Sequence, residues 1–106
     1  MGSALAACGG YAAPNEHMAA TQAAARAAME VGAKNSPDAS LHLKLAQEEI
    51  AQAQKLMGDG DNKRADYVLT RAKADAELAV ALARESAAQA EAQRLADTLK
   101  AIQGDK

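Results

Sequence analysis

One stretch of the sequence, residues 36–83, decides the fold; it reads SPDASLHLKLAQEEIAQAQKLMGDGDNKRADYVLTRAKADAELAVALA. The SPD at residues 36–38 predicts a helix start, because Ser is a good N-cap, Pro suits the first helical position and Asp complements the positive end of the helix dipole. No Gly or Pro follows until Gly58. The GDGDN at residues 58–62 is typical of a turn, so we expect a helical hairpin around it.

Apolar residues in this stretch alternate between spacings of four and three, the heptad pattern of helices that pack side by side. Before the turn, the row consists of Ala39, Leu43, Ala46, Ile50, Ala53 and Met57. After the turn, it consists of Leu69, Ala72, Ala76, Ala79, Ala83, Ser86 and Ala90. Further on, the stripe moves to Ala88, Ala92, Leu95, Leu99 and Ile102, which predicts that the partner changes face along the last helix.

Outward from the hairpin, the helix breakers predict a first helix as well. Pro14-Asn15 offers a start with a cap, and Gly32 lies where a C′ glycine belongs. We expect helices at about residues 15–31, 37–57 and 62–102, within one helical domain at 15–103. Residues 1–14 precede this domain, and residues 104–106 form a C-terminal tail.

Two architectures satisfy these lengths, and both are all-α with alanine-rich seams. Residues 15–57 and 62–103 are about equally long, and each would span about 60 Å as continuous helix. They therefore fit a long antiparallel hairpin in which the first arm is broken near Gly32. The rival is a compact, coiled-coil-like three-helix bundle, in which the first helix folds back over the hairpin.

The composition excludes several classes of protein and partner. Alanine supplies 30 of the 106 residues, with three Val, two Ile and no Phe or Trp, so a β-sheet core is excluded. The net charge of −2 offers no basic surface for nucleic acid. An alanine core is thin, because a buried Ala methyl contributes about 0.8 kcal/mol against about 1.5–3 kcal/mol for Leu. Spare alanine faces therefore also favour self-association into a homo-oligomer.

The only cysteine, Cys8, lies in a pattern that predicts lipidation. Leu5, Ala6, Ala7 and Gly9 surround it with the spacing of a bacterial lipobox. In such a site a diacylglycerol is added to the thiol, and a peptidase that needs small neighbouring side chains cuts before the cysteine. A complete signal has a longer apolar segment, so we interpret residues 1–7 as a signal-peptide remnant behind an expression start.

The residues after Cys8 read GGYAAP and predict a flexible tether, with Tyr11 near the lipid headgroups. A small residue rather than Asp at position 9 favours the periplasmic face of the outer membrane over retention at the inner membrane. The expected partners are therefore the membrane, through lipidated Cys8, and another envelope protein.

Patterns typical of catalytic or metal sites are incomplete. The segment at residues 59–64 begins like a calcium loop but has Lys63 at its fifth position and Arg64 at its sixth, so we interpret it as a turn with a cap at Asp61 or Asn62. His17 and His42 lack a local partner and are expected at the surface, as are the solvated carboxylates of residues 48 and 49. We expect no enzyme activity, metal or cofactor.

Methionine and tyrosine are interpreted as packing residues. Met18, Met29 and Met57 fall near helix seams or ends and are expected to fill the core rather than form a binding surface. Tyr67 is one turn into the last helix, and we expect it to pack over the turn near Met57.

The chain resembles a known family over residues 36–84. The matching residues are Ser36-Pro37, Leu45-Ala46, Ala53, Leu56, Gly58-Asp59-Gly60-Asp61, Ala65, Leu69, Ala72, Asp75-Ala76 and Leu78-Ala79. They resemble the bacterial lipoprotein family of domain of unknown function 4398. Its usual pattern has an aromatic directly after the Gly-Asp of the turn, whereas here Asn62 occupies that place. The resemblance implies an envelope lipoprotein and carries no settled activity.

Braun-type alanine-zipper lipoproteins are similar in composition and end in a lysine that is linked to peptidoglycan, as Lys106 ends this sequence. Those proteins are single uninterrupted helices, which Gly32, Pro37, Gly58 and Gly60 contradict, so peptidoglycan linkage is unsupported. The sequence thus predicts a lipid-anchored scaffold or adaptor of the bacterial envelope. The alternative is a soluble, self-associating helical interaction module without an anchor.

Overall fold

The computed structural model describes residues 10–104, and these form an all-α fold, as predicted. Its helices are α1 (Asn15–Glu30), α2 (Pro37–Gly58) and α3 (Asn62–Gly104), with a short 3₁₀ turn, η1 (Ala33–Asn35), between the first two. Each helix begins at the predicted residue and ends within two residues of its predicted end. The 43 residues of α3 make a helix about 64 Å long.

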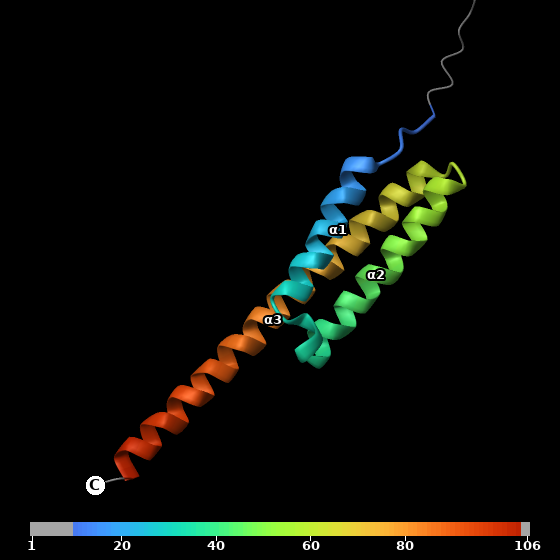
Figure 1. Ribbon diagram of the computed structural model, residues 1–106. Helices are drawn as coiled ribbons and strands as arrows, with labels where there is room; N and C mark the ends of the chain where they lie inside the picture. Colours follow the sequence, from blue (N-terminus) through green and yellow to red (C-terminus); the bar gives the residue numbers. More distant parts are fainter. Residues whose placement is uncertain (1–9, 105–106) are drawn as a thin grey trace, which may run out of the picture.

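The first helix folds back, which decides between the two predicted architectures. α1 packs on both α3 and α2, and the three helices run alternately along one axis, with α1 parallel to α3 (Figure 1). The alternative, in which the first helix continues the hairpin arm, is wrong. The reversal is made at Gly32, whose φ of +87° is left-handed and therefore suits a residue without a Cβ.

The turn between α2 and α3 satisfies the last carbonyl groups of α2. The N–H of Asp61 donates to the carbonyl of Leu56 at 2.8 Å, and the N–H of Gly60 donates to that of Met57 at 3.1 Å. This is a Schellman motif, which needs a left-handed residue at C′, and Gly60 supplies it with a φ of +79°.

Two of the three predicted helix caps occupy the N-cap position, and one of these two also makes the capping hydrogen bond. Asp61 precedes α3, and its carboxylate accepts a hydrogen bond from the N–H of Arg64 at 3.3 Å, as a cap does. Ser36 occupies the N-cap position of α2, but its hydroxyl makes no capping bond. Asn15 is the first residue of α1 and not its cap, since Pro14 takes that position.

The core is a column of alanine methyl groups with a few larger side chains. Eleven of the sixteen buried apolar residues in the described part of the chain are alanine. Both predicted hairpin rows lie in this core up to Ala83, and Met57 packs at its edge. The larger members are Met18, Leu43, Ile50, Val68 and Leu69. The thin core follows directly from the composition.

α1 contributes one buried polar residue, Thr21, and one predicted core residue is exposed instead. The hydroxyl of Thr21 donates to the carbonyl of His17 at 2.7 Å, so its burial leaves no unpaired donor. Met29 is 38% exposed, contrary to its predicted core role, and its sulfur accepts a bond from Gln47 at 3.8 Å.

Candidate functional site

The described part of the tether, residues 10–14, is docked on the first turns of α3. The hydroxyl of Tyr11 donates to Asp66 Oδ2 at 2.5 Å, and the side-chain amide of Asn62 donates to the carbonyl of Tyr11 at 3.1 Å. Asp66 Oδ1 accepts a second bond, at 2.5 Å, from Nδ1 of His17 on α1. One carboxylate on α3 therefore fixes both the tether and the start of α1.

The charge of Asp66 is reflected in two pKa values. The hydrogen bonds from Tyr11 and then from His17 hold the pKa of Asp66 below its usual value. The same hydrogen bond to Asp66, aided by the repulsion between the carboxylate and a phenolate, raises the pKa of Tyr11 above its ordinary value of 10.0. The contact is therefore intact across the pH range between these two titrations.

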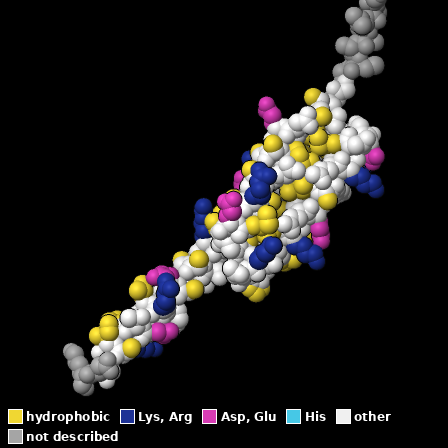
Figure 2. Space-filling view, in the orientation of Figure 1, with side chains coloured by type: hydrophobic (Ala, Val, Ile, Leu, Met, Phe, Trp, Pro, Cys, Tyr) yellow, Lys and Arg dark blue, Asp and Glu magenta, His cyan; other side chains and the backbone are white. Residues whose placement is uncertain are grey.

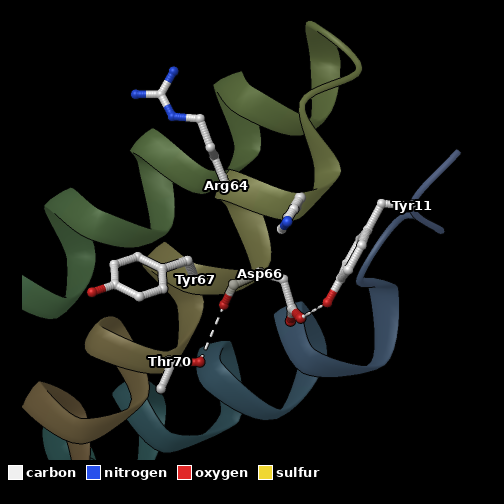
Figure 3. Close-up of a pocket in the computed structure, with 6 residues that line it drawn as sticks. Tyr11, Arg64, Asp66, Tyr67 and Thr70 are labelled. Atoms are coloured by element: carbon white, nitrogen blue, oxygen red, sulfur yellow. Dashed lines mark hydrogen bonds between the residues drawn. The ribbon is translucent and has the colours of Figure 1, made fainter.

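Beside this contact lies an open hollow of about 410 Å³. It is lined by Tyr11, Lys63, Arg64, Asp66, Tyr67 and Thr70. Figure 3 shows Tyr11 of the tether and Tyr67 of α3 on opposite sides of Asp66. Tyr67 is 71% exposed, so the prediction that it packs over the turn near Met57 is wrong.

The ionisation of Tyr11 tests the docked tether. A Tyr67→Phe variant keeps Tyr11 as its only tyrosine, and we expect its phenol to titrate above pH 10.0 when followed by phenolate absorbance. Adding Asp66→Asn should lower that pKa toward 10.0, because the acceptor is then uncharged. The matched control, Asp97→Asn at an exposed site on the same helix, should leave it unchanged. An identical titration in the Asp66→Asn variant would show that the tether is not held there.

A second polar cluster joins α2 to α3 near the middle of the bundle. His42 Nδ1 donates to Asp75 Oδ1 at 2.9 Å. Glu49 lies one heptad after His42, and its Oε2 atom is enclosed without a hydrogen-bond partner among the described residues. The prediction of a solvated carboxylate holds for the exposed Glu48 and is wrong for Glu49, which is half-buried.

The pKa values of the two carboxyl groups in this cluster shift in opposite directions. Burial, followed by the hydrogen bond to Asp75 and repulsion from it, raises the pKa of Glu49 to about 7. Burial acts to raise the pKa of Asp75 too, but the hydrogen bonds from Glu49 and His42 outweigh it and leave that pKa below its usual value. Glu49 therefore keeps its proton to a higher pH than Asp75 does.

We therefore expect the stability of the fold to fall with rising pH as Glu49 loses its proton. Its pKa is about 7 in the folded chain and 4.5 without the fold, so the folded state holds this proton more tightly. Stability through this group is fully present below pH 4.5, declines between about 4.5 and 7, and is constant above. Glu49→Gln should remove this slope. Since water screens the pair, we expect a gain of about 1 kcal/mol at pH 8, or roughly 4–8 °C in Tm.

Thermal unfolding measured from pH 4 to pH 8 would check this expectation. Glu48→Gln is the control, because it removes the exposed neighbouring charge and should keep the wild-type slope. A wild-type slope in Glu49→Gln would contradict the raised pKa of Glu49.

Beyond the bundle, α3 continues as an arm, residues 87–104, all of them exposed. Figure 1 shows it projecting past the start of α2, and Figure 2 shows hydrophobic side chains exposed near its end. The rotated stripe of the sequence is here, with Leu95, Leu99 and Ile102 between 55% and 62% exposed. At about 100° per residue, Leu99 lies on the opposite side of the helix from Ala90, the last residue of the row that enters the bundle.

No described residue packs on the arm. The sequence predicted that α3 would meet a partner on a different face here, and within residues 10–104 there is no such partner. Ser86 is half-buried and Ala90 is exposed, which marks the end of the packed row. The arm spans about 27 Å of unsupported helix.

The lipobox residues Cys8, Leu5, Ala6, Ala7 and Gly9 lie outside the described residues, and so does Lys106. Lipidation therefore stays a prediction. No helix of the described chain combines the length and apolarity that a membrane span requires. Within residues 10–104, no three His, Cys, Asp or Glu side chains come together as metal ligands.

Neither the Asp66 cluster nor the His42–Asp75 cluster was predicted from the sequence. The register of the hairpin could have indicated the second of them. Folding at residues 58–62 places His42 and Asp75 within about one turn of the same level. Asp66 is different, because its partners come from α1 and the tether, whose direction the sequence left open.

Comparison with known proteins gives one match. The family model described as "Domain of unknown function (DUF4398)" matches residues 16–95, which run from α1 into the arm of α3. No curated protein matches the chain. No solved structure matches it either.

Proposed function

The chain belongs to the DUF4398 family, and we propose that it is a lipoprotein of the bacterial envelope, anchored through Cys8 and acting as a scaffold or adaptor in the periplasm. The family supplies no activity, so the proposal depends on the lipobox and on the shape of the domain. Gly9 after the cysteine supports the outer membrane as the location.

The opposite placement of tether and arm supports this function best. The tether meets the bundle at the end that holds the α2–α3 turn, and the arm projects from the other end (Figure 1). An anchored molecule that stands upright would thus hold its exposed apolar stripe about 50–60 Å from the anchored end of α3. Such a geometry suits a spacer that presents Leu95, Leu99 and Ile102 to a second envelope protein.

The number of acyl chains expected on Cys8 is enough to anchor the protein. A single acyl chain gives only marginal binding, whereas two or three hold a protein firmly. The modification expected at Cys8 provides a diacylglycerol and an N-terminal acyl group, and this would be sufficient without any membrane-spanning helix.

The intact mass of the protein from its native envelope tests the proposal. We expect a chain that begins at Cys8 and carries a diacylglycerol and an acyl group, recovered with the membranes. Cys8→Ser should move it to the soluble fraction, while Gln89→Ala, a change in the exposed arm, should not. An unmodified soluble wild-type chain would refute anchoring. An additional muropeptide would support linkage through Lys106.

The exposed stripe favours one alternative, a soluble helical module that self-associates. Two arms packed through Leu95, Leu99 and Ile102 would remove these side chains from water. Analytical ultracentrifugation of the unlipidated chain separates the two functions. A stable dimer that Leu95→Gln abolishes would favour the module, and a monomer would favour a different protein as the partner of the arm.

A further inference from the structure

We propose that the hollow between Tyr11 and Tyr67 binds the headgroup of a zwitterionic phospholipid in the membrane that the tether enters. This inference rests on the proposed anchoring at Cys8. It adds a second membrane contact, which would fix the orientation of the bundle and direct its arm away from the surface.

Chain length places the hollow at the membrane surface. Tyr11 follows Cys8 by three residues, which span at most about 11 Å when fully extended. Tyr11 is in turn held on α3 by its bonds to Asp66 and Asn62. An acylated Cys8 would therefore keep this end of the bundle within reach of the headgroup layer.

The aromatic residues support the same location. Tyr11 and Tyr67 are the only aromatic residues in the sequence, and although far apart along it they line one hollow. Neither is used in the core. Tyrosine is enriched at membrane–water interfaces, because its ring is apolar and its hydroxyl is polar. A location at the membrane surface would account for the exposure of Tyr67.

The charges around the hollow match a headgroup that carries both signs. Lys63 is in no ion pair among residues 10–104 and can bind a phosphate, whereas Arg64 beside it is paired with Asp61 at 3.4 Å. Asp66, together with the faces of the two tyrosine rings, can receive an ammonium group. Asp59, Asp61 and Glu16 add negative charge at this end, which disfavours a purely anionic lipid.

A titration with the soluble headgroup glycerophosphoethanolamine, followed by backbone amide NMR, tests the site on the unlipidated chain. We expect shifts at residues 63–70 and at Tyr11. Tyr67→Ala and Lys63→Gln should each weaken binding about two- to fivefold, the range of an exposed cation–π contact or similar. The controls Leu95→Ala and Lys100→Gln change exposed residues of the same helix outside the hollow and should bind as wild type.

The outcomes are distinguishable. Equal shifts with inorganic phosphate alone would overturn the proposal, because they would show a simple anion site. No shifts with glycerophosphoethanolamine would overturn it as well. Circular dichroism would confirm that each variant is folded, which the exposure of Tyr67 leads us to expect.

A membrane experiment separates this inference from the proposed lipidation. The Cys8 thiol is coupled chemically to a maleimide lipid in phosphatidylethanolamine–phosphatidylcholine vesicles that carry a headgroup spin label. Amides of residues 63–70 should broaden more than those of the arm, and Tyr67→Ala should reduce the difference. Equal broadening along α3 would refute the docking. Because the link is synthetic, this result does not depend on whether cells lipidate Cys8.

Discussion

Leu69→Ala is expected to lower the free energy of unfolding by about 3 kcal/mol, within the roughly 2–5 kcal/mol that buried Leu→Ala changes cost. Leu69 is the largest apolar side chain that is completely enclosed in the described chain, and the buried residues one turn before and after it, Ala65 and Ala72, are too small to fill the space. For a domain of this size, the loss corresponds to a Tm lowered by roughly 12–24 °C. Thermal and urea unfolding followed by circular dichroism would measure it.

Leu95→Ala is the matched control on the same helix. Leu95 is 61% exposed in the arm, so the same chemical change should alter stability by less than about 0.5 kcal/mol. If the two substitutions cost the same, Leu95 is buried in solution, and the arm is then covered by a second copy of the chain.

Ala72→Leu is expected to destabilise the bundle by about 1–3 kcal/mol. Ala72 is completely buried in the row of small residues where α3 faces the other helices. Added methyl and methylene groups have no space there, so the helices must separate or the side chain must leave its preferred rotamer. The substitution enlarges the apolar surface, and a loss of stability would therefore show that close approach matters more here than hydrophobicity.

Ala87→Leu provides the comparison, because Ala87 is exposed at the start of the arm. Alanine and leucine have similar helix propensity, so this variant should unfold like the wild type. A more stable Ala72→Leu variant would mean that the alanine row is loosely packed and that the thin core has room to fill.

Most of the secondary structure could be predicted because its signals are local. Pro37 in the first turn of α2, Gly60 in the left-handed C′ position and the cap at Asp61 depend on neighbouring residues only. The heptad rows were equally predictable as far as Ala83, since their spacing reflects helix geometry alone. The prediction was wrong at Ala90, which is exposed, because the apolar pattern continues there although the partner helices have ended.

The candidate site was predicted less well. Tyr67 was expected to pack near Met57, and the structure places it beside a hollow that Tyr11 also lines. Glu49 was expected in solvent, and its environment depends on Asp75 from a different helix. Each of these errors concerns a contact between residues far apart in the sequence.

The sequence by itself determined three helices, one tight hairpin turn and a thin alanine core, because breakers, caps and periodicity act over a few residues. Only the tertiary structure decided that α1 returns along α3 and that the last part of α3 stands free. Both architectures bury similar alanine surfaces, so composition could not choose between them. The choice depends on the left-handed turn at Gly32 and on the bonds that Asp66 makes to His17 and Tyr11, which exist only once the helices are packed.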